Sequence, residues 1–264
     1  GTKMGLAPMH TWLPDAHSEA PSPASALLTG VLLHCAYLGI FKTNKIMQAA
    51  GLGTFSGNIL IVFGLASMLA AATFIIRQTE YKRLLAYSSI ENMGIIAFGT
   101  GIGGLGAYGA VLCLIHHSLI KSALFLSSGN ILMGYGSRLI EKTGNLAKLM
   151  PKTFVAFFGG FVGIAGMPPF GIFLGELLII LGAFRSGHYW GVGLFILSIC
   201  VIFAGFANHV MKIAFGGTGV DIQTKEIPNM VWPQLALLFT SIVLFFWMPG
   251  TLYQTIINAL KYSG

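Results

Sequence analysis

The sequence predicts an all-α fold, a polytopic transmembrane helical bundle, on three observations. First, 55% of the 264 residues are hydrophobic and 9% are charged, whereas an ordinary soluble domain has about 25% charged residues. Second, charge-free runs exceed the roughly 20 residues that span a bilayer as a helix; they cover residues 46–76, 92–120, 153–175, 186–211 and 227–260. Third, many of the 35 glycines and 10 prolines fall inside these runs. A bilayer tolerates such residues where neighbouring helices or water-lined cavities satisfy the freed backbone groups, so broken helices are expected within a single transmembrane domain, residues 1–264.

The first elements are predicted to alternate between short polar segments and spanning helices. Residues 1–8 are too few to span a bilayer, and residues 9–21, which hold prolines, histidines and acids, are expected to form a polar connection. A spanning helix is predicted over residues 22–41, with Pro23 near its start, where a missing N–H costs little. The next spanning helix is expected at residues 57–76.

The middle of the chain predicts two helices joined by a glycine-rich turn. A short basic loop at residues 77–83 precedes a helix at residues 88–99. Residues 99–109 are too rich in glycine for a stable helix interior, so a turn is expected there. The second helix is expected to reach about Met133, and the polar residues 138–152 are expected to form a surface loop.

The C-terminal part predicts a discontinuous helix followed by two spanning helices. Residues 153–183 are long enough to span, but Gly166-Met-Pro-Pro-Phe-Gly171 places two prolines between two glycines. Proline removes a backbone donor and clashes with the preceding turn, so this segment should open in mid-membrane. Spanning helices are then expected at residues 189–213 and 230–248.

The basic residues divide unevenly between the two ends predicted for this bundle. Such an asymmetry is typical of multi-pass proteins of the cell inner (cytoplasmic) membrane, which is the expected location. The positive-inside rule makes the more basic end cytoplasmic and places the C-terminus outside. The same asymmetry accounts for the net charge of +7, so no nucleic-acid partner is expected. The basic end receives Arg77, Lys82, Arg83, Arg138, Lys142, Lys148, Lys152, Lys212 and Lys225, and the other end receives Lys42, Lys45, Arg185 and Lys261.

Nucleotide, metal and disulfide sites are not expected. Residues 101–106 match G-x-G-x-x-G, but they follow a membrane run instead of a strand. His116 and His117 are adjacent, so on a helix they point about 100° apart and cannot chelate one metal. The three cysteines, Cys35, Cys113 and Cys200, are isolated in apolar stretches and are interpreted as packing residues. No cofactor is therefore expected on this chain.

A few ionisable side chains inside the apolar runs are the candidate functional residues. A charged group at a helix centre costs about 2.5 to 3.5 kcal/mol on insertion scales, so each needs an internal partner or a water-filled cavity. Lys121 follows His117 by four residues and shares its helix face, a spacing that fits a proton relay in preference to snorkelling of Lys121 to the interface. The candidates are Lys3, His34, Glu91, His117, Lys121 and Glu176, with His116 as a further possibility.

Three of these candidates keep a structural alternative. Glu176 follows the Pro168-Pro169 break, where water would keep it titratable, but it could instead cap the second half-helix. His34 fits a satisfied core histidine as well as a relay member. Glu91, beside Ser88 and Ser89, fits an ordinary helix-start role as well as a functional one.

Four segments resemble the antiporter-like, proton-conducting membrane subunits shared by respiratory complex I, Mrp-type sodium/proton antiporters and energy-converting hydrogenases. Among them, the hydrogenase-4 component F and formate hydrogenlyase branch is the most similar, through residues 88–94 and 117–121. The segments occur in family order and are Gly1-Thr-Lys-Met-Gly-Leu-Ala-Pro-Met-His-Thr-Trp-Leu-Pro-Asp-Ala-His-Ser-Glu-Ala-Pro-Ser-Pro23, Tyr81-Lys-Arg-Leu-Leu-Ala-Tyr-Ser-Ser89, His117-Ser-Leu-Ile-Lys-Ser-Ala-Leu-Phe125, and Gly166-Met-Pro-Pro-Phe-Gly171 with Gly175-Glu176.

The resemblance implies roles for the buried residues. Lys3 matches the lysine of a broken helix, His117 and Lys121 match the central relay, and Glu176 matches the terminal site. His34 stands where many members have a bridging lysine. Family members also carry N-terminal helices absent from this chain, including a glutamate that pairs with the lysine at the Lys3 position. The chain is therefore expected to be the second half of such a subunit.

The resemblance also implies a function, a proton-translocating membrane subunit of a redox-driven complex of hydrogenase-4/formate hydrogenlyase or NADH-quinone oxidoreductase type. The expected partners are other membrane subunits, a redox arm, lipid and protons. No redox motif occurs on the chain, so any enzyme activity is expected to belong to the partners. Two alternatives stay open, an Mrp-type cation/proton antiporter subunit and a truncated structural membrane subunit.

Overall fold

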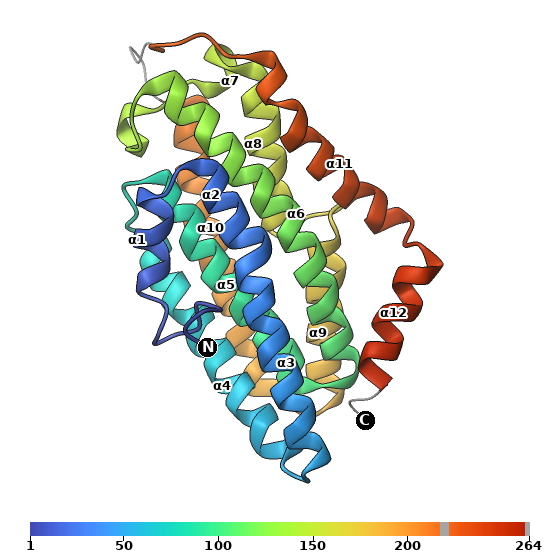
Figure 1. The fold of residues 1–264 in the computed structure, drawn as a ribbon. Helices are drawn as coiled ribbons and strands as arrows, with labels where there is room; N and C mark the ends of the chain where they lie inside the picture. Colours follow the sequence, from blue (N-terminus) through green and yellow to red (C-terminus); the bar gives the residue numbers. More distant parts are fainter. Residues whose placement is uncertain (217–221, 262–264) are drawn as a thin grey trace.

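All regular elements are helical in the computed structural model, which describes residues 1–216 and 222–261 (Figure 1). Within these ranges no β-strand forms, and only an isolated bridge joins Glu80 and Leu139. The prediction of an all-α bundle is confirmed. In chain order, with π-helix η1 and 3-10 helices η2 and η3, the elements are α1 (Trp12–Glu19), α2 (Ser22–Leu27), η1 (Leu28–Leu32), α3 (Leu33–Ala49), α4 (Gly53–Ile75), α5 (Tyr81–Ile102), α6 (Gly104–Tyr135), η2 (Ile140–Lys142), α7 (Leu146–Leu149), α8 (Pro151–Ile164), α9 (Gly171–Arg185), α10 (Tyr189–Phe215), η3 (Pro228–Met230), α11 (Trp232–Phe246) and α12 (Gly250–Lys261).

The chain is a multi-pass membrane protein. Five helical stretches of the described part are long and apolar enough to cross a membrane: Ser22–Ala49, Gly53–Ile75, Gly104–Tyr135, Tyr189–Phe215 and Pro228–Phe246. Helix α6 is central, because α2, α5, α8, α9 and α11 all pack against it. Helix α5 lies beside α6 and is buried along almost its whole length. The polar residues of α5 and α6 are therefore enclosed by protein instead of lipid.

The glycine-rich turn is much shorter than the sequence predicts. Helix α5 continues to Ile102 and α6 begins at Gly104, so the helices run through most of residues 99–109. These glycines let helices approach closely, as small residues do in membranes. A Cβ on Gly109 would lie only 2.5 Å from the carbonyl oxygen of Gly175 in α9. Tight packing therefore outweighs the low helix propensity of glycine.

Helical structure also extends beyond three predicted boundaries near the N-terminal half. The expected polar connection at residues 9–21 contains α1. The first spanning helix reaches Ala49 instead of Phe41, with a π-helical turn at Leu28–Leu32. Helix α5 begins at Tyr81, so the basic loop is shorter than residues 77–83. Hydrogen bonds from the neighbouring loop hold this start, since the amide of Tyr81 donates to the carbonyl of Arg138 at 3.3 Å.

The predicted discontinuous helix is confirmed, and a second interruption occurs later. Helix α8 ends at Ile164 and α9 begins at Gly171, so the two half-helices flank the double-proline segment. The helix expected at residues 230–248 ends at Phe246, and α12 follows from Gly250 (Figure 1). Pro249 stands between them, and proline cannot continue the hydrogen-bond ladder of the preceding helix.

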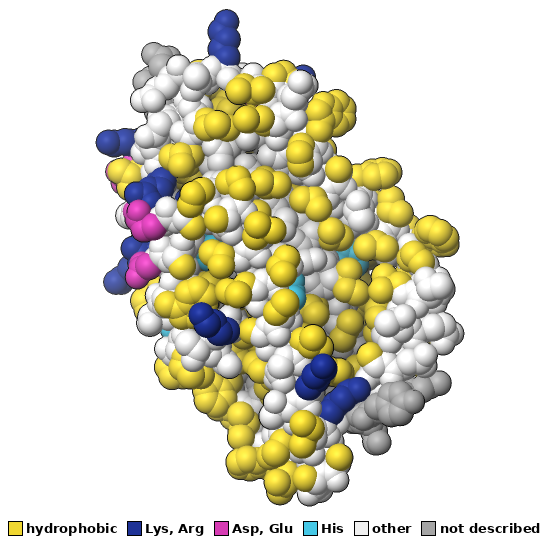
Figure 2. Space-filling view, in the orientation of Figure 1, with side chains coloured by type: hydrophobic (Ala, Val, Ile, Leu, Met, Phe, Trp, Pro, Cys, Tyr) yellow, Lys and Arg dark blue, Asp and Glu magenta, His cyan; other side chains and the backbone are white. Residues whose placement is uncertain are grey.

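The loops at residues 76–80 and 136–150 lie together at one end of the bundle, which we call the basic end. The amide of Ile140 donates to the carbonyl of Thr79 at 2.9 Å, and His209 of α10 bonds to the last carbonyls of α4. All nine basic residues that the sequence assigns to one side lie in or beside these segments. Charged side chains gather at the upper left of the visible face, around α1, while hydrophobic side chains cover much of the rest (Figure 2).

Candidate functional site

Helix α6 carries the central group of candidate residues. His116, His117 and Lys121 are 2%, 0% and 0% exposed. A charged group at this depth is costly unless it has an internal partner. All three side chains are buried on one helix, and their roles depend on the contacts that they make.

Lys121 points into the protein interior, toward α5. Its Nζ atom donates to the carbonyl oxygen of Leu85 at 2.6 Å and to the hydroxyl oxygen of Ser88. The ammonium group therefore ends against α5 and does not reach an interface, which argues against snorkelling. Both partners are neutral acceptors, so within residues 1–216 and 222–261 no carboxylate is hydrogen-bonded to Lys121 to fix its charge.

His34 and His117 face each other between α3 and α6. Nε2 of His34 lies 3.2 Å from Nδ1 of His117, and Nδ1 of His34 lies 2.7 Å from the carbonyl oxygen of Gly30 in η1. Because a carbonyl oxygen only accepts, Nδ1 of His34 carries the proton in that bond. In a neutral pair, His117 then donates from Nδ1, and its Nε2 keeps a lone pair. This nitrogen is buried and has no hydrogen-bond partner in the described residues, so it can accept a proton.

Glu91 occupies the middle of α5, which excludes the helix-start role. Helix α5 begins ten residues earlier, at Tyr81. Glu91 is 6% exposed and lines a cavity of about 10 Å³ together with Glu176 and residues of α8 and α10. A cavity of roughly 10 to 15 Å³ accommodates one water molecule. Glu91 also interacts electrostatically with Lys121 and with Glu176.

Glu176 lies beside the break between α8 and α9. Its carboxylate fills the space that a Cβ on Gly166 would occupy, and Gly166, just after the end of α8, has a φ of +66°. The first turn of α9 contains no acidic residue, and the cap residue Phe170 makes no side-chain hydrogen bond. Glu176 itself lies in the second turn of α9, so the helix-capping alternative stays a prediction beside the proton site. The carboxylate joins the break to the cavity that Glu91 shares.

His116 points away from His117, as the spacing of adjacent helical residues requires. Its Nδ1 atom lies 2.8 Å from the hydroxyl oxygen of Ser241 in α11, and its ring fills the space that a Cβ on Gly171, the first residue of α9, would occupy. His116 therefore contacts the break, on a different side of α6 from Lys121.

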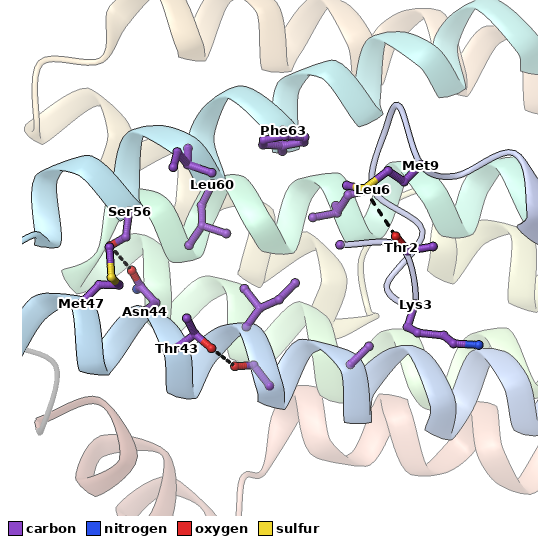
Figure 3. A pocket seen from close by; sticks show the side chains of 15 residues that line it. Thr2, Lys3, Leu6, Met9, Thr43, Asn44, Met47, Ser56, Leu60 and Phe63 are labelled. Atoms are coloured by element: carbon purple, nitrogen blue, oxygen red, sulfur yellow. Dashed lines mark hydrogen bonds between the residues drawn. The ribbon is translucent and has the colours of Figure 1, made fainter.

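Lys3 is exposed, in contrast to the burial that the sequence predicts. The turns ahead of α1 bury Met4 and Leu6 but leave Lys3 exposed, and the Nζ atom of Lys3 lies 5.6 Å from the centroid of the Trp12 ring. Lys3 lines one end of a mostly apolar cavity of about 650 Å³, and Asn44 and Ser56 lie at the other end (Figure 3). Among the described residues, no contact joins Lys3 to the other candidates.

Several buried histidine and lysine residues are missing from the sequence-based candidates, among them His10 and His209. The two most deeply buried are His17, 0% exposed, and Lys82, 2% exposed. From the sequence, these two belong to a polar connection and a basic loop, where charged groups are solvated. No glycine or proline separates Tyr81 from Met93, and this continuity was the signal that Lys82 belongs to α5. In the described residues, no group of three or more His, Cys, Asp or Glu side chains is placed to hold a metal ion.

Comparisons with known proteins agree with this architecture. The hydrogenase-4 component F homologue of Methylacidiphilum infernorum (isolate V4) is 42% identical over 232 residues, which are 86% of this chain and 48% of that protein. Chain 4 1 of the NAD(P)H-quinone oxidoreductase of Synechococcus sp. (strain JA-2-3B'a(2-13)) is 39% identical over 190 residues, 72% of this chain and 36% of that protein.

The fold of this chain also matches that of a chain in a solved respiratory complex. A chain of respiratory complex I from Thermus thermophilus with bound NADH superposes with a TM-score of 0.84 at 25% identity, and the match covers 100% of this chain and 56% of that chain. This chain thus spans about half the length of the relatives it matches. The family model described as NADH:quinone oxidoreductase/Mrp antiporter, TM, matches residues 1–201, so the chain belongs to this family of antiporter-like membrane subunits.

Proposed function

We propose that this chain moves protons across a membrane as part of a redox-driven complex of hydrogenase-4/formate hydrogenlyase or NADH-quinone oxidoreductase type. It acts as the second half of a longer antiporter-like subunit in the cell inner membrane, with the basic end in the cytoplasm. Electron transfer takes place on partner subunits, and this chain supplies buried groups that take up and release protons. The names of its relatives, a hydrogenase-4 component F homologue and a chain of NAD(P)H-quinone oxidoreductase, support this choice of complex.

One observation carries the proposal. Lys121 is fully buried, bonds only to neutral acceptors on α5 among the described residues, and interacts electrostatically with Glu91. Glu91 in turn shares a water-sized cavity with Glu176 at the break. A buried lysine held by neutral groups can lose its proton and regain it, because in the described part of the chain no salt bridge fixes its charge.

The contacts suggest an order for the proton path. His34 and His117 form one arm, in which a proton accepted at Nε2 of His117 can pass to His34 through the 3.2 Å contact. Lys121 occupies the centre. Glu91, one water molecule and Glu176 form the second arm, which reaches the break between α8 and α9. Lys3 would join this path only through groups outside the described contacts, so its role rests on the resemblance alone.

The proposal is tested with Lys121→Ala in the full-length subunit within its complete complex. Inverted membrane vesicles are energised in parallel with formate, hydrogen or NADH, and proton uptake is followed with a pH-sensitive dye. We expect Lys121→Ala to assemble and to lose proton uptake, because it removes the central group while relieving a buried charge. The matched control is Lys142→Ala, since Lys142 is exposed in η2 at the basic end.

The substrate that drives uptake identifies the redox partner type. Uptake with formate or hydrogen supports the hydrogenase branch, and uptake with NADH supports the quinone oxidoreductase branch. Uptake that needs a sodium gradient and no redox substrate would favour the Mrp-type antiporter, which the same family description includes. Normal pumping by an assembled Lys121→Ala complex would favour a structural subunit.

A further inference from the structure

His17 and Lys82 are buried at the basic end, and the path from Lys121 to Glu176 uses neither of them. His17 lies on α1 and Lys82 lies in the first turn of α5. Both are almost inaccessible to solvent. A buried imidazole and a buried ammonium near each other are costly to keep unless they have a function.

The contacts of His17 leave one ring nitrogen open. Its Nε2 atom lies 3.2 Å from the hydroxyl oxygen of Thr29 in η1, and its ring stacks on Phe125 of α6, with centroids 4.5 Å apart. The Nδ1 atom is buried and has no hydrogen-bond partner in the described residues. A histidine kept only for packing would be expected to have both nitrogens satisfied.

Lys82 lies directly beneath a polar cluster at the surface of the basic end. Its Nζ atom donates to the carbonyl oxygen of Ala20 at 2.8 Å. Two carboxylates interact electrostatically with it, those of Glu19 and Glu80. Glu19 is exposed and pairs with Arg138 at 3.0 Å. Acids at the surface therefore stand close to the ammonium group of Lys82.

Packing contacts connect His17 with α5 and α6, because α1 packs against α5 and His17 stacks on Phe125 of α6. The charges of Lys82 and Lys121 both act on its imidazole and disfavour the protonated form. Phe125 lies one turn from Lys121 on the same face of α6. Lys121 bonds to the carbonyl of Leu85, which is three residues, or about 4.5 Å of helix rise, from Lys82 on α5. These contacts place Lys82, His17 and Lys121 on neighbouring segments of α5, α1 and α6.

We propose that Lys82 and His17 form a proton-access branch that reloads Lys121 from the basic end, an inference that rests on the proposed function. The ammonium of Lys82 gives a proton to Nδ1 of neutral His17, which becomes an imidazolium. The imidazolium passes a proton to the neutral amine of Lys121. Lys82 then takes a proton from the medium through the surface acids, so one proton moves inward and both residues return to their starting states.

The main test replaces His17 by glutamine in the full-length subunit within its complete complex. His17→Gln keeps a hydrogen-bonding side chain that can reach Thr29 but cannot carry a proton. We expect proton uptake at least about tenfold slower, since a positioned proton-transfer group contributes about that or more. The matched control is His10→Gln, because His10 is also buried, with an unpartnered Nδ1, but it contacts Phe74 instead of this branch.

A second variant supplies a readout that a packing role would not change. His17→Ala leaves space beside Phe125, and imidazole added on the basic-end side of inverted vesicles should restore part of the uptake.

Lys82→Arg keeps the charge and the bond to Ala20, but a guanidinium does not release its proton. Lys82→Arg should therefore also slow proton uptake. If His17→Gln does not assemble, the uptake rate of Lys82→Arg tests the branch in its place. Lys212→Arg, at an exposed position of the same end, is its control.

The outcomes separate this inference from the proposed function. If Lys121→Ala abolishes uptake while assembled His17→Gln and Lys82→Arg pump at the wild-type rate, the branch is wrong and the central function stands. Slow uptake in His17→Ala that imidazole does not restore, in an assembled complex with normal Lys82→Arg, gives His17 a structural role only. Normal uptake in Lys121→Ala overturns the central function itself.

Discussion

The imidazole of His116 fills the space that a Cβ on Gly171 would occupy, where α9 begins. At the other side of the break, the carboxylate of Glu176 fills the space that a Cβ on Gly166 would occupy. Each glycine that brackets the double-proline segment is therefore contacted by an ionisable side chain. Because neither glycine carries a Cβ, the two polar groups reach the backbone of the break.

A methyl group at Gly171 would overlap the ring of His116, so it should displace this ring or the backbone of the break. We expect Gly171→Ala to destabilise the assembled subunit by about 1 to 3 kcal/mol, the usual cost of overpacking a tight site. The measurement is the thermal unfolding of the purified complex in detergent. Gly193→Ala is the control, because a Cβ there meets nothing within 4 Å.

The double variant His116→Ala with Gly171→Ala should recover part of this loss, since removing the imidazole frees the space that the methyl group needs. Additive losses would mean that the contact of His116 with Gly171 does not set the geometry of the break.

His34 should be needed for the histidine arm of the path. Its Nε2 atom lies 3.2 Å from Nδ1 of His117, so His34→Ala leaves His117 with no proton partner on that side. We expect proton uptake to fall at least about tenfold in vesicles with the complete complex. His34→Lys should retain more activity than His34→Ala, because an ammonium can also release a proton. The control is His188→Ala, in the turn before α10.

An assembled His34→Ala complex with wild-type uptake would make His34 a satisfied core histidine, as its bond to Gly30 alone would allow.

The orientation of the bundle can be tested by cysteine labelling in intact cells. We replace the three native cysteines and introduce Gln78→Cys at the basic end or Ser186→Cys at the opposite end. Because basic loops stay in the cytoplasm, an impermeant maleimide added outside should label Ser186→Cys and leave Gln78→Cys unlabelled until the cells are opened. The reverse pattern would invert the proposed orientation.

The sequence predicts the class of fold and the break because these depend on strong local signals. Apolar runs of membrane length and the segment Gly166-Met-Pro-Pro-Phe-Gly171 leave few alternatives in a bilayer. Boundaries are predicted less well. Glycines at positions 99–109 suggest a long turn, but most of them serve close helix packing, and this depends on which helices become neighbours.

The candidate site is predicted only in part, for a related reason. His117 and Lys121 share a helix face by spacing alone, so their proximity is visible in the sequence. His17 and Lys82 are buried because α1 folds against α5 and the chain near Arg138 covers the basic end. Such burial depends on contacts between segments far apart in the sequence. The expected burial of Lys3 fails for the same reason, since no local pattern shows what covers the turns before α1.

Glu91 and Glu176 should act on one proton, because they line the same cavity of about 10 Å³. Glu91→Gln and Glu176→Gln keep the shape of each side chain but remove its titration. We expect each single variant to assemble and to lose most proton uptake, while Glu176→Asp keeps part of it. The control is Glu141→Gln, at an exposed acid in η2 of the basic end.

The double variant distinguishes one shared path from two independent ones. If a proton must pass both carboxylates in turn, Glu91→Gln with Glu176→Gln should pump no more slowly than the slower single variant, because the path is already interrupted. Two separate paths would instead give losses that multiply, as for independent sites. Uptake at the wild-type rate in assembled Glu176→Gln would remove this residue from the path. In that case the contact with Gly166 would be a packing contact, and Glu176→Ala would change the stability of the break while leaving the rate of uptake unchanged.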